Sequence, residues 1–140
     1  MSLSEAPVST IAGPDADFTT KERSLVFRIA GRVYACDVGD VREVVPLDRL
    51  TRLPGAPETI LGLMNVRGSI VTVVNAAAVL HPGDAQRKQR MVLVVDVGDR
   101  GVGIAVERVA DVRALREEEG YAAIDVRQIV RRVVDTSGDQ

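Results

Sequence analysis

The chain has 140 residues, 46% of them hydrophobic and 27% charged, which suits one globular domain or two closely joined small ones. Its formal net charge of −2 gives no electrostatic basis for binding nucleic acid or an acidic membrane surface. Aromatic residues make up 3% of the chain, so the core of the protein must be mainly aliphatic.

Further features of the sequence indicate the cellular compartment of the protein and which of its residues fold. No apolar run approaches the roughly 20 residues of a membrane span, and the N-terminus lacks the pattern of a signal peptide. The single cysteine, Cys36, fits a reducing compartment, so we expect a cytoplasmic protein. Residues 1–22 are rich in Ser, Thr, Ala, Pro and Asp and are predicted to be a disordered tail. The predicted domain covers 23–135, and a second disordered tail covers 136–140.

The start of this domain has the pattern of a β-hairpin. Apolar residues alternate over Leu25–Ile29, and Val33–Cys36 is a second short run. Gly31 lies between them and adopts positive φ at little steric cost, which favours a tight turn. Further along, one interpretation of Val38–Val45 is a short helical turn running into a strand, and the periodicity of this segment leaves that assignment open. The proline-bounded piece Leu47–Leu53 is expected at a sheet edge or in a loop.

The stretch Thr59–Asn75 combines three kinds of local signal. Ile60–Met64 follows Pro57 and is predicted to form one or two helical turns, with proline near the first helical position. Asn65–Gly68 then breaks that pattern and turns the chain. Ile70–Val74 is a β-branched run, typical of a strand buried on both faces.

Arg67 is a cation placed between an apolar turn and an apolar strand, and two interpretations of it remain open. The first is an ordinary solvated turn arginine, whose role is to keep the turn in water. The second is a fixed donor at a docking surface, since a guanidinium can bond backbone carbonyls or a carboxylate in a set geometry.

The next segment predicts a short helix and a hairpin. Asn75 is well placed to cap Ala76–Leu80, because its side-chain oxygen can accept a bond from an unpaired amide of the first turn. Met91–Val97 and Val102–Val109 are strongly apolar strands joined by Gly98–Gly101. This is the clearest hairpin in the chain.

The chain closes with two short strands and a helix. Asp111–Leu115 and Tyr121–Ile124 are predicted strands separated by a charged turn over 116–120. Asp125 is a plausible cap for an amphipathic helix. Many short strands with brief helical turns predict a mainly β fold of barrel type. The apolar stripe of the last helix is Val126, Ile129, Val130 and Val133.

The sequence offers no arrangement of residues suited to catalysis or metal binding. His81 precedes a proline in a loop, and Cys36 lies in an apolar strand with no histidine near it in sequence. The motif Gly98-x-x-Gly101-x-Gly103 resembles a phosphate loop, but a strand follows it instead of a helix, so a hairpin turn explains it. No cluster of Cys or His offers transition-metal ligands. We therefore expect neither an enzyme nor a cofactor.

Several short motifs follow one another in a distinctive order. They are Leu25–Ile29 with Tyr34 on the next strand, Val41–Val44, Leu53–Pro54, Ile60–Gly68, and Met91–Val95 with Val102–Val106. In this order they resemble the CheW-like adaptor family, over Ser24 to about Val134. The most specific part is Ile-Leu-Gly-x-x-Asn-x-Arg-Gly, which spans Ile60–Gly68.

This resemblance implies a fold and a set of partners. The family fold is two small five-stranded, SH3-like barrels around a shared apolar interface. Its members are cytoplasmic scaffolds, without a cofactor, that join the tips of methyl-accepting chemoreceptors to the histidine kinase CheA. The regulatory domain of that kinase has the same fold. For this chain, the resemblance implies two such barrels with short helical turns and a C-terminal amphipathic helix.

The family's receptor groove lies between the barrels and takes the helical tip of a receptor. A groove of this kind needs exposed aliphatic residues, small residues for close approach and a few oriented charges. Each valine of the set has an alternative role in the ordinary core. Carried across by motif, the groove comprises Val41, Glu43, Gly62, Arg67, Met91, Gly103, Val109 and Val112.

The chain departs from the family pattern in two places. The family continues Pro-Val-Val-Asp-Leu-Arg after the central strand, whereas this chain has Thr72–Ala77, which removes an arginine and a leucine from a contact surface. After Leu115 the family has a long connection and a further hairpin, whereas here only 116–120 precedes the next strand. We therefore expect one barrel to be incomplete, with an unpaired edge.

These departures lead to the expected function. We expect a scaffold that binds a receptor tip but binds the kinase weakly or not at all, and so modulates or insulates receptor–kinase coupling at receptor clusters. One alternative is an ordinary adaptor that couples receptor to kinase. Another, of a different class, is an unrelated β-barrel interaction domain.

Overall fold

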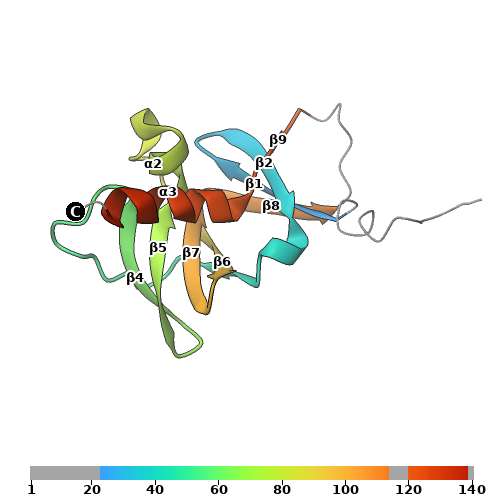
Figure 1. The fold of residues 1–140 in the computed structure, drawn as a ribbon. Coiled ribbons are helices and arrows are strands. Elements are labelled where there is room, and N and C mark those ends of the chain that lie inside the picture. Colours follow the sequence, from blue (N-terminus) through green and yellow to red (C-terminus); the bar gives the residue numbers. More distant parts are fainter. Residues whose placement is uncertain (1–22, 114–119, 139–140) are drawn as a thin grey trace, which may run out of the picture.

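The computed structural model describes residues 23–113 and 120–138. The predicted N-terminal tail and the last two residues of the predicted C-terminal tail lie outside these ranges. Residues 114–119 do so too, and they contain the end of the predicted strand Asp111–Leu115 and most of the expected turn over 116–120. Within them, β-strands in two sheets are the main regular structure, accompanied by short 3-10 turns and helices α2 and α3 (Figure 1). The mainly β fold predicted from the sequence is therefore confirmed.

The strands divide between the sheets according to their position in the chain. A five-stranded sheet has the order β3-β6-β7-β5-β4, and a four-stranded sheet has the order β8-β1-β2-β9. The five-stranded sheet is thus one continuous stretch of chain, inserted between β2 and β8. The strands are β1 (Ser24–Ile29), β2 (Arg32–Asp37), β3 (Glu43–Pro46), β4 (Ile60–Val66), β5 (Ser69–Asn75), β6 (Met91–Val97), β7 (Arg100–Val106), β8 (Arg108–Arg113) and β9 (Ala122–Ala123). The helical elements are η1 (Val38–Asp40), α2 (Ala76–Leu80), η2 (Pro82–Asp84) and α3 (Val126–Gly138).

The five-stranded sheet curls until its two edges approach each other. Its edge strands are β3 and β4, yet Glu43 of β3 bonds Arg67 in the turn after β4, with 2.8 Å between Oε1 and Nε. Thr51, in the segment that leaves β3, exchanges two backbone hydrogen bonds of 2.8 Å with Leu63 of β4. Contact between the two edges is how a sheet begins to close into a barrel.

Alternation along β6 gives this sheet a different core on each face. Successive strand residues point to opposite faces, so Val92 and Val94 face the inside of the curl while Leu93 and Val95 face outward. All four side chains are fully buried. The cluster inside the curl consists of Met64, Val66, Val71, Val73, Val92, Val94 and Ala105.

The outer face packs on the four-stranded sheet and the two helices, forming the larger core. The red α3 ribbon in Figure 1 runs across the strands of the five-stranded sheet. Asp125 caps this helix as predicted, its Oδ1 accepting from the amide of Arg127 at 3.0 Å. The predicted stripe is buried, each of its residues being at most 5% exposed, and this confirms the prediction: Val126, Ile129, Val130 and Val133.

The four-stranded sheet is built around the predicted hairpin of β1 and β2. Ala30 and Gly31 form its turn, with φ of 53° and 77°. β8 pairs with the other side of β1 in an antiparallel register that shifts once. β9 adds only two residues, Ala122 and Ala123, parallel to β2. One edge of this sheet is therefore very short.

The prediction of helical turns over Ile60–Met64 is wrong, because this segment is strand β4. It pairs with β5 through a two-residue turn whose residues, Arg67 and Gly68, both have positive φ (51° and 86°), as a type I′ turn requires. The register shifts between Ile60 and Gly62, which is the signature of a bulge. A bulge interrupts strict alternation, so the apolar residues fall in a spacing that also suits a helix.

The other local predictions agree with the structure to within a few residues, with one exception. Ile70, at the start of the strand predicted to be buried on both faces, is 63% exposed. A 3-10 turn, η1, leads into β3 as predicted. Asn75 caps α2, with 3.3 Å between its Oδ1 and the amide nitrogen of Ala78. The β6–β7 hairpin forms as predicted, although β7 ends at Val106 and β8 begins at Arg108. That break transfers the chain from one sheet to the other.

Candidate functional site

Glu43 and Arg67 form an oriented ion pair at the closing edge of the five-stranded sheet. The Arg67 side chain is 79% exposed and that of Glu43 is 20% exposed. The turn holding Arg67 is braced by Asn65, whose Oδ1 accepts from the amide of Gly68 at 2.9 Å. Glu43 raises the pKa of Arg67 through its hydrogen bond and its charge. The guanidinium is therefore fixed at one end and still presents free N–H groups to solvent.

The ion pair continues into a row of charges along the surface. Arg42 lies 4.0 Å from Glu43 and bonds Asp96 at 2.7 Å. From α3, Arg127 pairs with Asp40 at 3.1 Å and also donates to the backbone oxygen of Asp96 at 3.3 Å. Opposite charges thus alternate from the β4–β5 turn, across β3 and β6, to α3. Such surface pairs contribute little to stability, but they fix the direction of charged groups.

The two glycines among the predicted groove residues occupy sites of close packing. A Cβ on Gly103 would lie 2.7 Å from Cγ1 of Val92, inside the curl of the five-stranded sheet. A Cβ on Gly62 would lie 2.3 Å from the backbone oxygen of Thr51, at a φ of 150°. Both sites need glycine for the fold itself, and a receptor contact by either remains a prediction.

The four apolar residues of the predicted groove are spread over both sheets. Val41, Met91 and Val109 are half-buried against the larger core, while Val112 on β8 is 40% exposed. Arg67 lines a hollow of about 270 Å³ between β3 and β4, and none of the other seven predicted residues lines that hollow. The structure therefore brings Glu43 and Arg67 into contact, and it does not gather the whole set around one cavity.

The described residues hold no group prepared for catalysis or metal binding. Burial raises the pKa of the Cys36 thiol to about 12, with smaller contributions from Asp40, Asp37 and Asp125, so the thiol stays protonated at neutral pH. His81 bonds the hydroxyl of Tyr34 through Nε2 at 2.6 Å. No cluster of three or more potential metal ligands occurs in the described part of the chain.

Sequence reasoning overlooked one charged cluster, where the two sheets meet. It comprises Arg87, Lys88 and Arg90, from the loop after η2, with Glu107 from the break between β7 and β8 and Arg108 from the start of β8. In the sequence these are two separate charged runs, and each looks like an ordinary solvated segment. Only the antiparallel pairing of β6 with β7 brings the start of the first strand beside the end of the second.

In its described part, the chain is a β-rich domain with two cores and a row of oriented surface charges. The comparisons with known proteins place it more closely. The CheW-like domain matches residues 23–139, and the chain therefore belongs to the CheW-like family. The resemblance predicted from the motifs is confirmed, and an unrelated β-barrel domain is excluded.

Individual relatives agree with this assignment. The chain is 32% identical to the chemotaxis protein CheW of Klebsiella aerogenes over 115 residues, which cover 81% of this chain and 67% of that protein. It is 37% identical to the protein PilI of Pseudomonas aeruginosa over 84 residues, 59% of this chain and 47% of PilI. The crystal structure of the scaffolding protein TtCheW from Thermoanaerobacter tengcongensis superposes with a TM-score of 0.60 at 29% identity. The match covers 69% of this chain and 63% of that one.

The chain thus spans about half the length of PilI and under two thirds of the TtCheW chain. Among the described residues, no helix is long and apolar enough to cross a membrane. The fold similarity extends to both sheets as a mainly β arrangement.

Proposed function

We propose that the protein is a non-enzymatic scaffold of a bacterial chemosensory system, which binds the cytoplasmic tip of a chemoreceptor and binds the CheA-type kinase weakly or not at all. It acts in the cytoplasm, at receptor clusters. Membership of the CheW-like family supports the scaffold role, since several relatives of the chain are named chemotaxis proteins. The proposed domain extends over 23–135, flanked by the tails at 1–22 and 136–140.

Receptor binding is proposed for the eight groove residues, with the Glu43–Arg67 pair as its polar part. A receptor tip is helical, and a helix docks best on aliphatic side chains beside a few oriented charges. Val112 supplies exposed aliphatic surface, and Arg67 supplies free donors held in place by a carboxylate. These features support the proposal because they combine exposed apolar surface for a helix with donor groups that point in a defined direction.

The observation that carries the kinase part of the proposal is strand β9. It has two residues, and it belongs to the four-stranded sheet, as does β8 on the other side of the short connection. If the connection between β8 and β9 were longer, we would therefore expect its additional residues to join this sheet. An incomplete barrel presents less surface to a partner, and its loose edge must be ordered when it binds.

Two separate titrations test this function. The protein is titrated with the signalling domain of the receptor encoded beside its gene, and then with the regulatory domain of the neighbouring kinase. The CheW of Klebsiella aerogenes, titrated with its own receptor and kinase domains, serves as the positive control. We expect saturable binding to the receptor domain and an affinity for the kinase domain at least about tenfold lower, which is about 1.4 kcal/mol.

Comparable affinity for both domains would contradict the weakened kinase contact and establish the ordinary adaptor. Binding to the kinase domain alone would contradict the receptor role. Because the same protein sample is used in both titrations, unfolding cannot mimic either result.

A further inference from the structure

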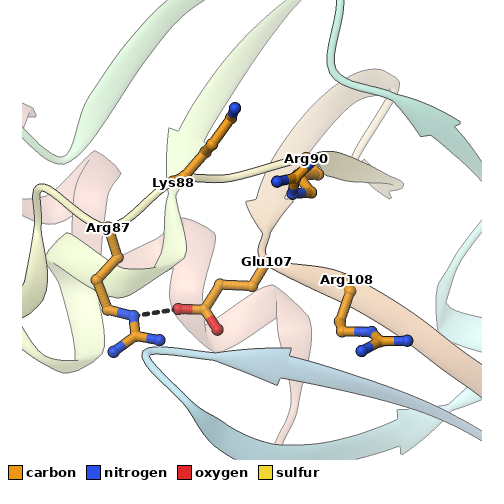
Figure 2. Close-up of a pocket in the computed structure, with 5 residues that line it drawn as sticks. All are labelled: Arg87, Lys88, Arg90, Glu107 and Arg108. Atoms are coloured by element: carbon orange, nitrogen blue, oxygen red, sulfur yellow. Dashed lines mark hydrogen bonds and ion pairs between the residues drawn. The ribbon is translucent and has the colours of Figure 1, made fainter.

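A cleft of about 620 Å³ lies where the two sheets meet, and cations line most of it (Figure 2). Four of its five lining residues are positively charged, although the chain as a whole carries a net charge of −2. None of the eight predicted groove residues is among them. The lining residues are Arg87, Lys88, Arg90, Glu107 and Arg108.

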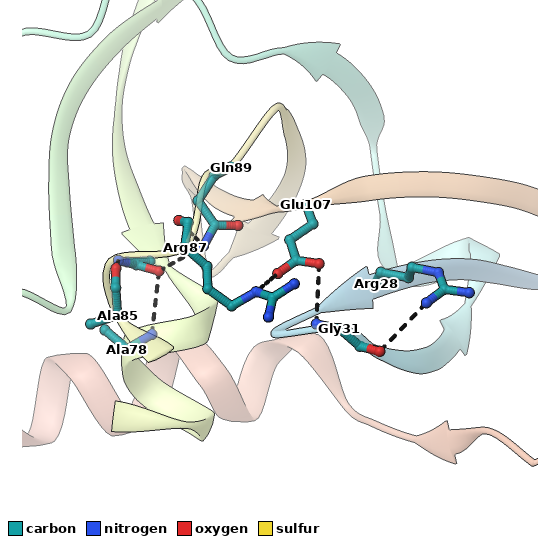
Figure 3. Close-up of polar contacts among 8 residues, drawn as sticks. Arg28, Gly31, Ala78, Ala85, Arg87, Gln89 and Glu107 are labelled. Atoms are coloured by element: carbon teal, nitrogen blue, oxygen red, sulfur yellow. Dashed lines mark hydrogen bonds and ion pairs between the residues drawn. The ribbon is translucent and has the colours of Figure 1, made fainter. Parts of the chain in front are cut away.

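Glu107 is the single anion of the cleft, and the protein itself satisfies it. Its side chain is only 14% exposed. Oε1 accepts from the backbone amide of Gly31 at 3.1 Å, and Oε2 accepts from Nε of Arg87, as Figure 3 shows. The carboxylate therefore neutralises Arg87 and fixes it across the β1–β2 turn. It leaves the charges of the other cations uncompensated.

The backbone around Gln89 keeps the neighbouring cations, Lys88 and Arg90, directed toward solvent. Gln89 is buried, and its Nε2 donates to Oδ1 of Asn75 at 3.2 Å. Its neighbours Lys88 and Arg90 are both exposed, on either side of this anchor. Figure 2 shows Lys88 directed away from Glu107. No ion pair joins Lys88, Arg90 or Arg108 to any other residue that the structure describes.

Arg108 also faces a second arginine on the neighbouring strand. In the antiparallel pairing of β1 with β8, Arg28 is the direct partner of Arg108. Directly opposed like charges destabilise a sheet, because their side chains emerge close together on the same face. The only described bond of the Arg28 side chain is a long one, 3.4 Å, to the backbone oxygen of Gly31. The fold thus concentrates positive charge here, and no ion pair among the described residues balances Arg28 or Arg108.

We propose that this cleft binds an acidic segment of a partner protein, through the Glu or Asp carboxylates of that segment. Guanidinium groups bind carboxylates in a planar, two-bonded geometry, and the exposed cations of the cleft can engage several carboxylates at once. The absence of aromatic residues from the lining disfavours single-stranded nucleic acid, which needs stacking platforms. The backbone amides of Arg87, Arg90 and Glu107 donate to backbone oxygens of the protein. The amide of Gly31 donates to Glu107, so these amides provide no cradle for a compact phosphate.

The proposal is independent of receptor or kinase binding, and a defined probe tests it. A fluorescein-labelled peptide of alternating Glu and Ala is titrated with the full chain at low and at high salt. The test variant is Arg90→Glu with Arg108→Glu. The matched control is Arg52→Glu, an exposed arginine in the segment between β3 and β4.

We expect saturable binding at low salt that weakens as salt rises. The double variant should bind at least about tenfold more weakly, since it removes two charge-assisted contacts, whereas the control should bind as the parent does. The single variant Arg108→Glu should lose affinity yet melt no lower than the parent, because it replaces a like-charge pair with an opposite-charge pair beside Arg28. A residue with a purely structural role would not behave in this way.

Three results would overturn the proposal. One is no saturable binding of the peptide at low salt. Another is equal binding by the parent and the double variant, which would place the peptide elsewhere. The third is displacement of the peptide by millimolar inorganic phosphate, or by a single-stranded RNA of equal charge. That result would assign the cleft to phosphate groups instead of carboxylates.

Discussion

The two sheets of the protein are stabilised in different ways. The five-stranded sheet has a core of its own inside its curl and also contributes its outer face to the larger core. Of the two clusters, the four-stranded sheet contributes to the larger one alone, although Val26 and Ala35 on its other face are also buried. One of its edges is the two-residue β9. The first sheet is therefore largely self-sufficient, whereas the second depends on what packs between the sheets.

Removing α3 is the most severe test of this comparison, because the helix fills the core on which the four-stranded sheet depends. Truncation before Asp125 deletes four buried aliphatic side chains, each worth about 1.5–3 kcal/mol. We expect a loss of several kcal/mol in the free energy of unfolding, measured by urea denaturation followed by circular dichroism. Removing only residues 139–140 is the control and should change nothing. An unchanged midpoint in the truncated protein would refute the dependence on α3.

Gly103→Ala tests the core inside the curl of the other sheet. The added Cβ would lie 2.7 Å from a Val92 methyl group, so the packing around it must shift. Overpacking of this kind costs about 1–3 kcal/mol. Gly83→Ala is the matched control, because nothing lies within 4 Å of its added Cβ. If the two variants have equal unfolding midpoints, the inner core is looser than its geometry indicates.

Arg67→Ala should have the smallest effect on stability. The side chain is largely exposed and its only described partner is Glu43, so the thermal midpoint should stay close to that of the parent. Binding to the receptor domain should weaken. Arg67→Lys should weaken it too, because lysine keeps the charge but loses the planar fork. A lower melting temperature with normal receptor binding would assign Arg67 to closure of the sheet instead.

Local patterns in the sequence predicted most strands and both helices. The stripe on α3 and the cap at Asn75 depend on near neighbours in the chain, so pattern and propensity suffice for them. Strand β4 was mistaken for helical turns because a bulge at Gly62 disturbs its alternation. Pairing with β5 identifies this segment as a strand, and that pairing depends on residues outside β4 itself.

A candidate site was easier to predict from the sequence when its residues lie close together in the chain. The turn holding Arg67 follows from Asn65–Gly68, but its carboxylate partner lies on the opposite edge strand, and only curling of the sheet joins them. The cationic cleft forms where the chain passes from one sheet to the other, and no sequence motif marks that point. The resemblance to a family supplied the residue identities for the groove. The structure divides them into two packed glycines, three half-buried apolar residues, the exposed Val112 and a surface ion pair.

The insertion of one sheet within the other has a consequence for the order in which the protein can fold during synthesis. β1 and β2 leave the ribosome first, but β8, the antiparallel partner of β1, is made only after the whole five-stranded sheet. The early hairpin must therefore wait with one side open, while the inserted sheet can complete its own pairings as it emerges. Closing the long loop between β1 and β8 is entropically easier once the intervening chain is compact. The segment that interrupts the four-stranded sheet thus also brings its two halves together.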